Sequence, residues 1–380
     1  MKGAIYSQQK CPVCGELFRD NFRNGLSCPD HPDQYATRFI VKYGRKLLKR
    51  FRSYDEACEF LTGIRYKDKE GSFDIRDYRR DNPLGFENQA RRYLAIKEKA
   101  VKPGSYRNIK REINRAIDEW GNRNIKAIGY AEIEDYLYGL DVSDKTRSNV
   151  RSVIHDFFSW VCHREDIPMP KMPKCDFELG WRNIVDLEIQ DAIIEEVKRI
   201  SYSKNPRIWI GIKWLATYIA IRPGEMVNLK EKHINVNGML VIPHPKEKKP
   251  KLVPMLEEDI ALYRSLPRGL PEMPFFRHNQ RKGVIAGTQF GKHLFYDYWK
   301  QACNNLDIEG VDLYGGTRHS TTTAMAKHFT RDEVRSATKH GTNKAFDRYC
   351  QAQNDGLKVY EKIAQIKRDK VVECINGVSG

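Results

Sequence analysis

Five residues in the C-terminal half of the chain have side chains that together can cleave a phosphodiester. Two arginines, Arg222 in IRPGE and Arg318 in GGTRHS, can clamp phosphate oxygens and stabilise charge that grows in the transition state. Lys246, on a basic turn, can protonate a leaving oxygen. His340 in KHG can hydrogen-bond a phosphate, and Tyr349 in DRYCQ carries a phenol that can act as a covalent nucleophile. Each residue alone is common in helices and turns, whereas the set in this order indicates a phosphodiester site.

This order of residues resembles the tyrosine recombinases, the phage integrase family. The family's pattern is an Arg in an A-R-x-x-E-like box, a Lys on a β-hairpin turn, H-x-x-R, and then a His or Trp followed by a Tyr. The resemblance covers roughly residues 180 to 365, and Lys246 lies eight residues before Pro254, which is the family's usual spacing. It implies that the catalytic residues are Arg222, Lys246, Arg318, His340 and Tyr349.

One position departs from the family's pattern. In H-x-x-R the His stands three residues before the second Arg, and here that position is Gly315, preceded by Tyr314. The residue that helps to take the proton of the nucleophile is therefore missing, and we expect Tyr314, His340 or a water molecule to compensate. His319, directly after Arg318, is interpreted as a packed structural residue.

Charged neighbours are expected to support the catalytic groups. Glu225, three residues after Arg222, either orients that arginine through a charge-assisted hydrogen bond or caps the following helix. The turn KEKKP between two predicted strands, MLVIPHP and KLVPML, is rich in lysine. Lys248 is the alternative to Lys246 as the proton donor. The lysines expected to bind phosphates are Lys248, Lys249 and Lys251.

The composition indicates a polyanionic partner. Among 380 residues, 66 Lys and Arg outnumber 50 Asp and Glu, for a formal net charge of +16 and a pI near 9.3. Charge alone does not separate specific DNA binding from solubility or weak adhesion. No run of 18 apolar residues predicts a membrane span, and the N-terminal MKGAIYSQQKCPVCG lacks the apolar region of a secretory signal. We therefore expect a cytoplasmic, nucleoid-associated protein of a bacterium or phage.

Three cysteines and one histidine near the N-terminus have the spacing of a metal site. Cys11 and Cys14 form one pair, and Cys28 and His31 form a second, in the pattern C-x2-C-x13-C-x2-H. Each pair closes a tight turn, and the set suits a closed tetrahedral site for structural Zn²⁺. Four protein ligands leave no open coordination position, which favours a structural over a catalytic ion. The alternative is four residues without a metal.

A small basic sheet is predicted after this site. Residues 39–43 alternate as a strand does, residues 46–51 form a second strand, and Ser53 begins a short helix that ends near Leu61. Such a sheet can enter a DNA major groove, or it can simply be a solvated face. In the resembled family, an N-terminal module often binds accessory arm-type DNA sites. The basic residues of this unit are Arg38, Lys42, Arg45, Lys46, Lys49, Arg50 and Arg52, of which we single out Arg45, Lys46 and Lys49 for DNA binding.

Four helical stretches between residues 84 and 165 predict a small bundle. The last has an apolar face of Val150, Ile154, Phe157, Phe158 and Val161. Long basic side chains on the helices favour contacts with DNA phosphates. In the resembled family this is the core-binding (SAM-like) domain, which closes over the duplex. The basic residues expected to bind DNA are Arg107, Lys110, Arg111, Lys145, Arg147 and Arg151.

The fold class is therefore multidomain and mainly α, with small β elements. We expect a zinc-ribbon and arm-binding module over residues 1–75, a helical core-binding domain over 76–170, and a mixed α+β catalytic domain over 176–380. Residues 66–83 are predicted to be a linker, and the Pro-rich residues 168–177 a flexible hinge.

Within the catalytic domain the apolar pattern predicts the elements that hold the chemistry. Residues 187–200 are amphipathic, and residues 208–221 are apolar on all sides, which predicts a buried core helix with Arg222 at its end. A terminal amphipathic helix is predicted over residues 356–370. In the family such a tail docks on a neighbouring protomer.

The resemblance implies a site-specific recombinase that integrates or excises a mobile element. Tyr349 would form a 3′-phosphotyrosine without ATP or a catalytic metal, because the covalent bond conserves the energy of the broken phosphodiester. The expected partners are double-stranded DNA with core and arm sites, a homotetramer on that DNA, and a DNA-bending accessory protein.

Three alternatives remain. The first is a weak or inactive DNA-binding protein of recombinase descent, which Gly315 makes possible. The second is an enzyme like the type IB topoisomerases, which would relax any supercoiled DNA. The third is a zinc-ribbon transcription factor, in which residues 1–75 carry all sequence specificity.

Overall fold

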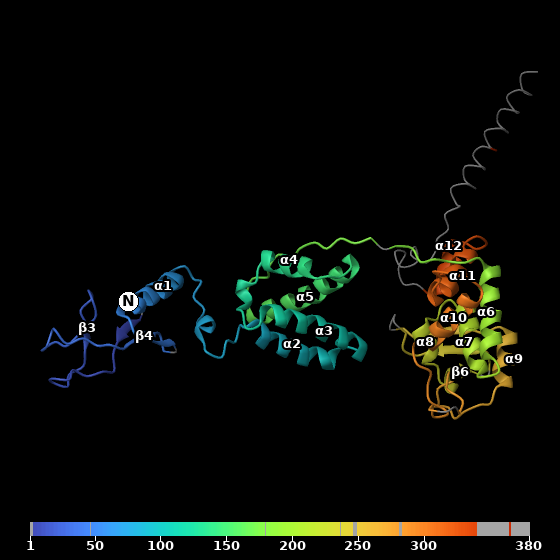
Figure 1. Ribbon diagram of the computed structural model, residues 1–380, viewed down its shortest axis with the longest axis horizontal. Helices are drawn as coiled ribbons and strands as arrows, with labels where there is room; N and C mark the ends of the chain where they lie inside the picture. Colours follow the sequence, from blue (N-terminus) through green and yellow to red (C-terminus); the bar gives the residue numbers. More distant parts are fainter. Residues whose placement is uncertain are drawn as a thin grey trace, which may run out of the picture. The chain divides into compact units, whose positions relative to one another are not determined.

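The computed structural model describes residues 3–45, 47–178, 180–235, 237–245, 249–280, 283–339 and 365. The described chain is mainly helical with small antiparallel sheets, as predicted (Figure 1). It divides into two compact units, Met1–Leu179 and Gly180–Gly380. Among the described residues no helix combines the length and the apolar character that crossing a bilayer requires.

The N-terminal part of the first unit is a three-stranded sheet covered by one helix. Strands β1 (Ala4–Tyr6), β4 (Phe39–Tyr43) and β5 (Leu47–Phe51) pair in the order β1-β4-β5, and all pairs are antiparallel. Helix α1 (Tyr54–Lys69) begins at Ser53, whose hydroxyl accepts a hydrogen bond from the Glu56 amide. The helix continues well past the predicted end at Leu61, because Ile64 is also buried in this core.

A short hairpin of strands β2 (Arg19–Asp20) and β3 (Leu26–Ser27) precedes β4. It is tied to the sheet module by a partly buried hydrogen bond, in which the Tyr54 hydroxyl donates to Asp20 Oδ1 at 2.5 Å, and by Leu26, which belongs to the same core as Val41. After α1 comes the 3-10 helix η1 (Ile75–Tyr78), within the stretch predicted to be a linker. The hairpin and η1 thus carry structure that the strand and helix patterns did not predict.

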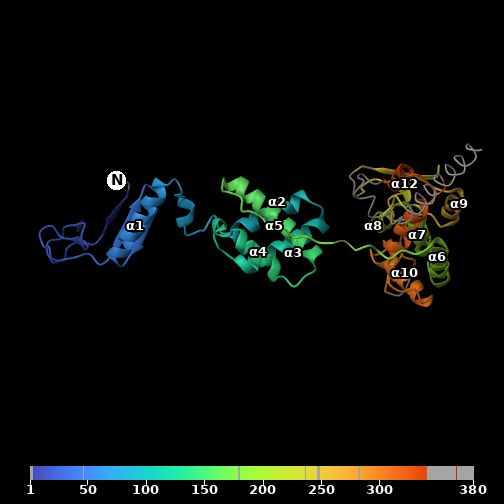
Figure 2. The same cartoon turned by 90° about the horizontal axis from the view of Figure 1, so that it is seen from above.

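The helical bundle is formed by the predicted helices. These are α2 (Phe86–Ala100), α3 (Pro103–Trp120), α4 (Tyr130–Gly139) and α5 (Asp144–Glu165), with the 3-10 turn η2 (Ile125–Ala127) between α3 and α4. Its centre is aromatic, because the ring of Phe86 lies 4.9 Å from Trp120 and 4.8 Å from Phe157. The predicted apolar face of α5 is buried in this core. Figure 2 shows α5 among the other helices of the bundle.

The Pro-rich stretch after α5 has no helix or strand, but it is held against the bundle. The Arg151 Nε donates to the Pro173 carbonyl at 3.0 Å, and the Tyr138 hydroxyl donates to the Lys174 carbonyl at 3.1 Å. Met172 and Cys175 pack against the bundle core. The absence of a helix or strand agrees with the predicted linker over residues 168–177, and these contacts attach residues 172–175 to the bundle.

The second unit is a larger α+β assembly. Its elements are α6 (Leu187–Ser201), α7 (Pro206–Thr217), α8 (Pro223–Val227), η3 (Glu231–His233), β6 (Ile234–Asn235), β7 (Met239–Ile242), β8 (Lys251–Pro254), α9 (Glu257–Ser265), α10 (Leu294–Asn305), the π-helical turn η4 (Gly315–His319), α11 (Ser320–Met325) and α12 (Arg331–Thr338). The strands pair antiparallel in the order β6-β7-β8.

Helix α7 is central to this unit and packs against α6, α10 and η4 (Figure 1). Gly211 allows α10 to approach α7, because a Cβ at that position would lie 2.3 Å from Phe295 Cζ. The helix was predicted to reach residue 221, but it ends at Thr217. Residues 218–221 then form a buried turn that leads directly to Arg222.

Candidate active site and nucleic-acid interface

Arg222 is held by the start of helix α8. It is the N-cap residue of that helix, and Pro223 takes the first helical position. Glu225 bonds back to it twice: its Oε2 accepts from the Arg222 amide at 3.1 Å, and its Oε1 lies 3.2 Å from Arg222 Nη1. The two readings of Glu225 from the sequence are therefore compatible, since one carboxylate both caps the helix and orients the arginine.

Lys251 is a third member of this cluster. Its Nζ lies 3.1 Å from Glu225 Oε2 and donates to the Ala220 carbonyl at 3.0 Å, and its side chain is only 4% exposed. Phosphate binding by Lys251 stays a prediction, and the structure places the Lys251 ammonium against Glu225. The signal that reveals its place is the alternation of β8, which puts Lys251 on the same buried face as Val253.

The second arginine, Arg318, lies in the π-helical turn η4 and is 1% exposed. Its Nη2 donates to the Thr338 carbonyl at 3.1 Å, at the end of α12. Turns of this kind widen the helix locally and frequently occur at functional sites. Because η4 packs on α7, which leads into the turn before Arg222, one core supports the segments that carry both arginines.

The side chains of His319 and Tyr314 pack against each other. Their rings are 5.4 Å apart in an edge-to-face arrangement, and the Arg182 guanidinium lies 5.4 Å from the Tyr314 ring. Burial, with the positive charges of Arg182 and Arg318, lowers the pKa of His319 to about 4. His319 is 5% exposed, so its interpretation as a packed residue agrees with its burial.

Several predicted site residues lie outside the described residues. They are Lys46, Lys246, Lys248, His340 and Tyr349. Lys249 is described and exposed, beside the turn between β7 and β8. Within the described chain, the structure brings together Arg222, Glu225 and Lys251 in one ionic cluster, and it buries Arg318.

The four predicted metal ligands converge in the first unit. The ligand atoms of Cys11, Cys14, Cys28 and His31 all lie within 4.8 Å of one another. Cys14 Sγ and Cys28 Sγ are 3.4 Å apart, and His31 Nδ1 lies 3.8 Å from both Cys11 Sγ and Cys28 Sγ. Zn–S bonds of about 2.3 Å and Zn–N bonds of about 2.0 Å in a tetrahedron require separations of this size. The cluster can therefore hold a metal ion, and three thiolates with one imidazole suit Zn²⁺.

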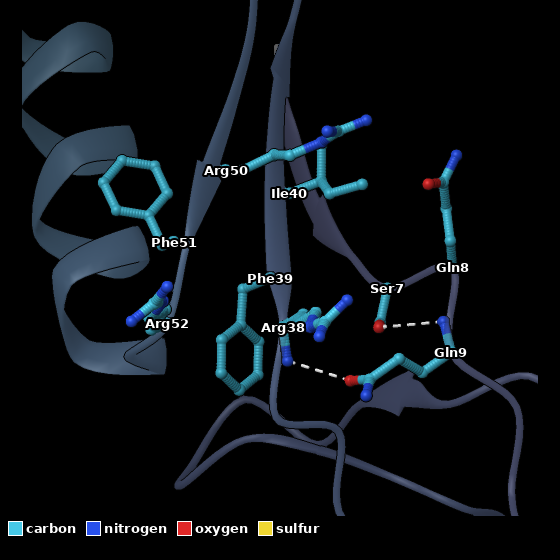
Figure 3. Close-up of a pocket in the computed structure, with 9 residues that line it drawn as sticks. All are labelled: Ser7, Gln8, Gln9, Arg38, Phe39, Ile40, Arg50, Phe51 and Arg52. Carbon is cyan, nitrogen blue, oxygen red and sulfur yellow. Dashed lines mark hydrogen bonds between the residues drawn. The ribbon is translucent and has the colours of Figure 1, made fainter.

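A groove lies between the end of β1, the start of β4 and the end of β5. It has a volume of about 570 Å³. Figure 3 shows its lining residues Ser7, Gln8, Gln9, Arg38, Phe39, Ile40, Arg50, Phe51 and Arg52. Gln9 fixes one wall, because its Oε1 accepts from the amides of Thr37 at 2.8 Å and Arg38 at 2.9 Å. Three arginines beside the exposed Gln8 form a surface that can bind phosphates and base edges.

The sheet register separates the basic residues of this module. Arg50 pairs with Ile40 and lines the groove, whereas Lys49 pairs with Val41, which faces α1. Lys49 Nζ lies 4.3 Å from the centre of the Phe60 ring on α1. The groove therefore contains Arg38, Arg50 and Arg52, and Lys49 lies on the other face of the sheet.

The basic residues of the bundle also have different environments. Arg107, Lys110 and Arg111 are exposed along one side of α3. Arg147 is 15% exposed and donates to the Leu137 carbonyl at 3.0 Å, where α4 ends. Lys145 Nζ lies 4.0 Å from the Phe177 ring, and Arg151 holds Pro173 as described above. The basic residues of α3 thus face solvent, while those of α5 secure neighbouring segments of the chain.

Comparison with solved structures relates this architecture to known proteins. The chain is similar to a truncated lambda integrase dimer bound to a COC′ core site, with a TM-score of 0.57, 14% identity, and coverage of 71% of this chain and 96% of that one. A longer lambda integrase dimer on the same site gives a TM-score of 0.57 and 13% identity, over 84% of this chain and 93% of that one. The Tn1549 transposon integrase with a circular intermediate DNA gives a TM-score of 0.57 and 11% identity, over 73% and 99%.

No family model matches the chain, and no curated protein matches it in sequence. The similarity is therefore one of fold. The resemblance to the tyrosine recombinases predicted from the sequence is confirmed at that level, since lambda and Tn1549 integrases both belong to them.

Proposed function

We propose that the chain is a site-specific DNA recombinase that cleaves and rejoins DNA through a covalent tyrosine intermediate. The observation that carries the proposal is the anchoring of Arg222 and Arg318 in a unit with an integrase fold. Arg222 is fixed by Glu225, and Arg318 is buried beside the end of α12. Two rigid guanidiniums supply the preorganised positive charge that a phosphoryl transition state requires. The order Arg, Lys, Arg, His, Tyr in the sequence supplies the remaining roles.

In the proposed reaction the Tyr349 oxygen attacks a scissile phosphate. The new P–O bond to Tyr349 forms as the bond to the 5′-oxygen breaks, and Lys246 gives that oxygen a proton, with Lys248 as the alternative donor. The phenol proton of Tyr349 passes to Tyr314, His340 or a water molecule. Arg222 and Arg318 neutralise the phosphorane, and His340 hydrogen-bonds one of its oxygens. The products are a 3′-phosphotyrosine and a 5′-hydroxyl. Attack by a 5′-hydroxyl of the partner strand reverses the chemistry and completes the exchange, so no ATP is consumed.

The first unit is proposed to supply DNA affinity. The groove arginines would bind an arm-type site, and Zn²⁺ on Cys11, Cys14, Cys28 and His31 would hold its outer wall. The exposed side of α3 would bind core-site phosphates. Residues 1–75, 76–170 and 176–380 are the proposed functional domains.

The assembly is proposed to be a homotetramer on two duplexes. Support comes from a lambda integrase tetramer bound to a Holliday junction, whose fold this chain shares with a TM-score of 0.54. Integration or excision of a mobile element in a bacterial or phage cytoplasm, assisted by a DNA-bending protein, completes the proposal.

The test is the trapping of a covalent complex on nicked suicide duplexes taken from DNA that flanks the gene. Without ATP or magnesium, the wild-type protein is expected to give a DNA-shifted band on a denaturing gel, and Tyr349→Phe is expected to give none. Tyr360→Phe is the matched control and should keep the band. An adduct that survives in Tyr349→Phe would overturn the assignment of the nucleophile.

A second function is favoured by one observation. A Cβ at residue 315 would lie 2.3 Å from the Asn183 carbonyl oxygen, so the usual histidine has no space there. A DNA-binding protein of recombinase descent without cleavage activity is therefore the alternative. It predicts sequence-specific binding with no adduct from the wild-type protein.

A further inference from the structure

The segment through which the chain enters the second unit is bound to the loop that carries Arg318. Residues 182–185, which we call the brace, run alongside residues 310–320. Arg182 forms an ion pair with Asp312, and Asn183 Nδ2 donates to the Gly310 carbonyl at 3.0 Å. The Val185 amide donates to Ser320 Oγ at 2.9 Å. The brace thus contacts the loop both before and after the π-helical turn η4.

The closest approach is at Gly315, the first residue of η4. A Cβ there would lie 2.3 Å from the Asn183 carbonyl oxygen, a backbone atom that cannot rotate away. On the other side, a Cβ on Gly316 would lie 2.2 Å from Trp299 Cζ2 of α10. Two glycines therefore allow η4 to fit between the brace and α10, and any side chain at residue 315 must displace the brace.

Hydrogen bonds inside the loop connect the brace to the turn that carries Arg318. Asp312, the partner of Arg182, also accepts from the Gly315 amide at 2.6 Å through Oδ1. Ser320 Oγ accepts a hydrogen bond from the Val185 amide and donates one to the Gly315 carbonyl at 2.9 Å. Both ends of the turn that carries Arg318 are therefore tied to the brace through one residue each.

We infer that the brace is a positioning element for Arg318, and that the Asn183 carbonyl occupies the place of the missing side chain at residue 315. The inference rests on the proposed function for its catalytic meaning. The inference and the family's motif predict opposite effects of placing a histidine at residue 315. Gly315→His would complete the H-x-x-R pattern, yet it is expected to displace the brace, move η4 and slow DNA cleavage.

The expected loss is large because cleavage depends on geometry. A displacement of about 1 Å in a charge-stabilising group can reduce the rate by about 100-fold. We therefore expect Gly315→His and Arg182→Asp each to slow single-turnover adduct formation by about 100-fold at saturating DNA, with DNA affinity unchanged. Asn183→Ala retains the carbonyl and is expected to stay much closer to wild type.

A charge exchange separates positioning from general damage. Arg182→Asp and Asp312→Arg reverse one partner each, and the double variant restores an ion pair of opposite polarity. The double variant restores the ion pair but not the hydrogen bond from the Gly315 amide to residue 312, so it should recover part of the cleavage rate lost in Arg182→Asp. The matched control is Arg199→Asp, which reverses the charge of a 68%-exposed arginine paired with Glu196 on α6 and should cleave at the wild-type rate.

Amide hydrogen exchange in α11 provides a readout that does not depend on activity. Faster exchange over residues 320–325 in Gly315→His and Arg182→Asp, and its partial reversal in the charge-exchanged double variant, would support the brace. The inference would be overturned if Gly315→His cleaved DNA at the same rate as the wild-type protein and showed the same amide exchange in α11. If the wild-type protein forms no adduct, the proposed function fails, while the exchange data still decide whether the brace positions the turn.

Discussion

At the scale of single residues, the carboxylate of Glu225 is the centre of the best-defined part of the site. It is 10% exposed and has cationic partners on two sides, Arg222 at 3.2 Å and Lys251 at 3.1 Å. A carboxylate in such surroundings is tolerated only while its charge is compensated. Lys251 on strand β8 therefore helps to fix Arg222, because it holds Glu225, the carboxylate that bonds to the arginine.

Lys251→Met should destabilise the second unit. The substitution keeps an apolar stem of similar length but leaves Glu225 with one cation fewer and the Ala220 carbonyl without its donor. The expected loss is about 2–3 kcal/mol, measured by urea unfolding.

Lys249→Met is the matched control for this prediction, because Lys249 lies near the same turn and is exposed. Its unfolding midpoint should equal that of wild type. An equal loss of stability in both variants would contradict the role assigned to the buried lysine.

His319 should make the second unit sensitive to acid. Its folded-state pKa of about 4 is below the ordinary value of 6.5, so between these values the unfolded chain binds the proton and the folded chain does not. Stability is therefore complete above about pH 6.5 and falls as the pH drops toward 4. His319→Gln should show a smaller fall in Tm between pH 7.5 and pH 5 than wild type.

His328→Gln provides the comparison, because His328 is an exposed residue shortly after α11. Its Tm should follow the wild-type dependence on pH. If His319→Gln retained the full wild-type dependence, burial of this imidazole would not be the cause.

At the scale of elements, the two turns that carry Cys11, Cys14, Cys28 and His31 are small. Their backbone closes locally, with the Gly15 amide donating to the Cys11 carbonyl at 2.9 Å and the Gln34 amide to the His31 carbonyl at 2.9 Å. Strands β2 and β3 between them contain two residues each. Such a hairpin has too few apolar contacts to fold alone, so metal binding is expected to stabilise it.

Metal analysis should find one Zn²⁺ per chain, and Cys28→Ser should lose it. Removal by a chelator should expose residues 10–36 to proteases, while residues 187–265 of the second unit remain protected. Cys58→Ser is the control, because Cys58 lies on α1 outside the cluster. Full protection of residues 10–36 after complete metal removal would contradict a structural ion.

At the scale of the whole molecule, the net charge of +16 is spread over both units but is effective only where side chains are exposed. The groove contributes Arg38, Arg50 and Arg52, and α3 contributes a second basic surface. Binding to DNA should therefore weaken steeply with salt, since each neutralised phosphate releases counterions.

Arg50→Gln should reduce this salt dependence. The loss of one phosphate contact lowers the slope of log K against log[salt] by about 1. Lys49→Gln is the neighbouring control, because Lys49 lies over Phe60 on the opposite face of the sheet and its loss should leave the slope unchanged. Equal slopes for wild type and Arg50→Gln would show that the groove does not contact DNA phosphates.

Local patterns predicted the elements better than they predicted the neighbours of individual residues. Helical periodicity predicted the bundle, strand alternation predicted β7 and β8, and cysteine spacing predicted the ligand cluster. The burial of Lys251, the use of Arg151 to hold the linker, and the carbonyl that fills the space at Gly315 were not predicted. Each depends on a partner more than 20 residues away, which no local pattern encodes.

The most direct test of the central claim is mass spectrometry of the trapped protein–DNA complex. After nuclease and trypsin digestion, the proposal predicts a phosphonucleotide on the peptide 349–358, attached at Tyr349. That result would establish the nucleophile and, from the attached nucleotide, the cleaved strand. A nucleotide on any other residue, or specific DNA binding with no modified peptide on an active suicide substrate, would contradict it.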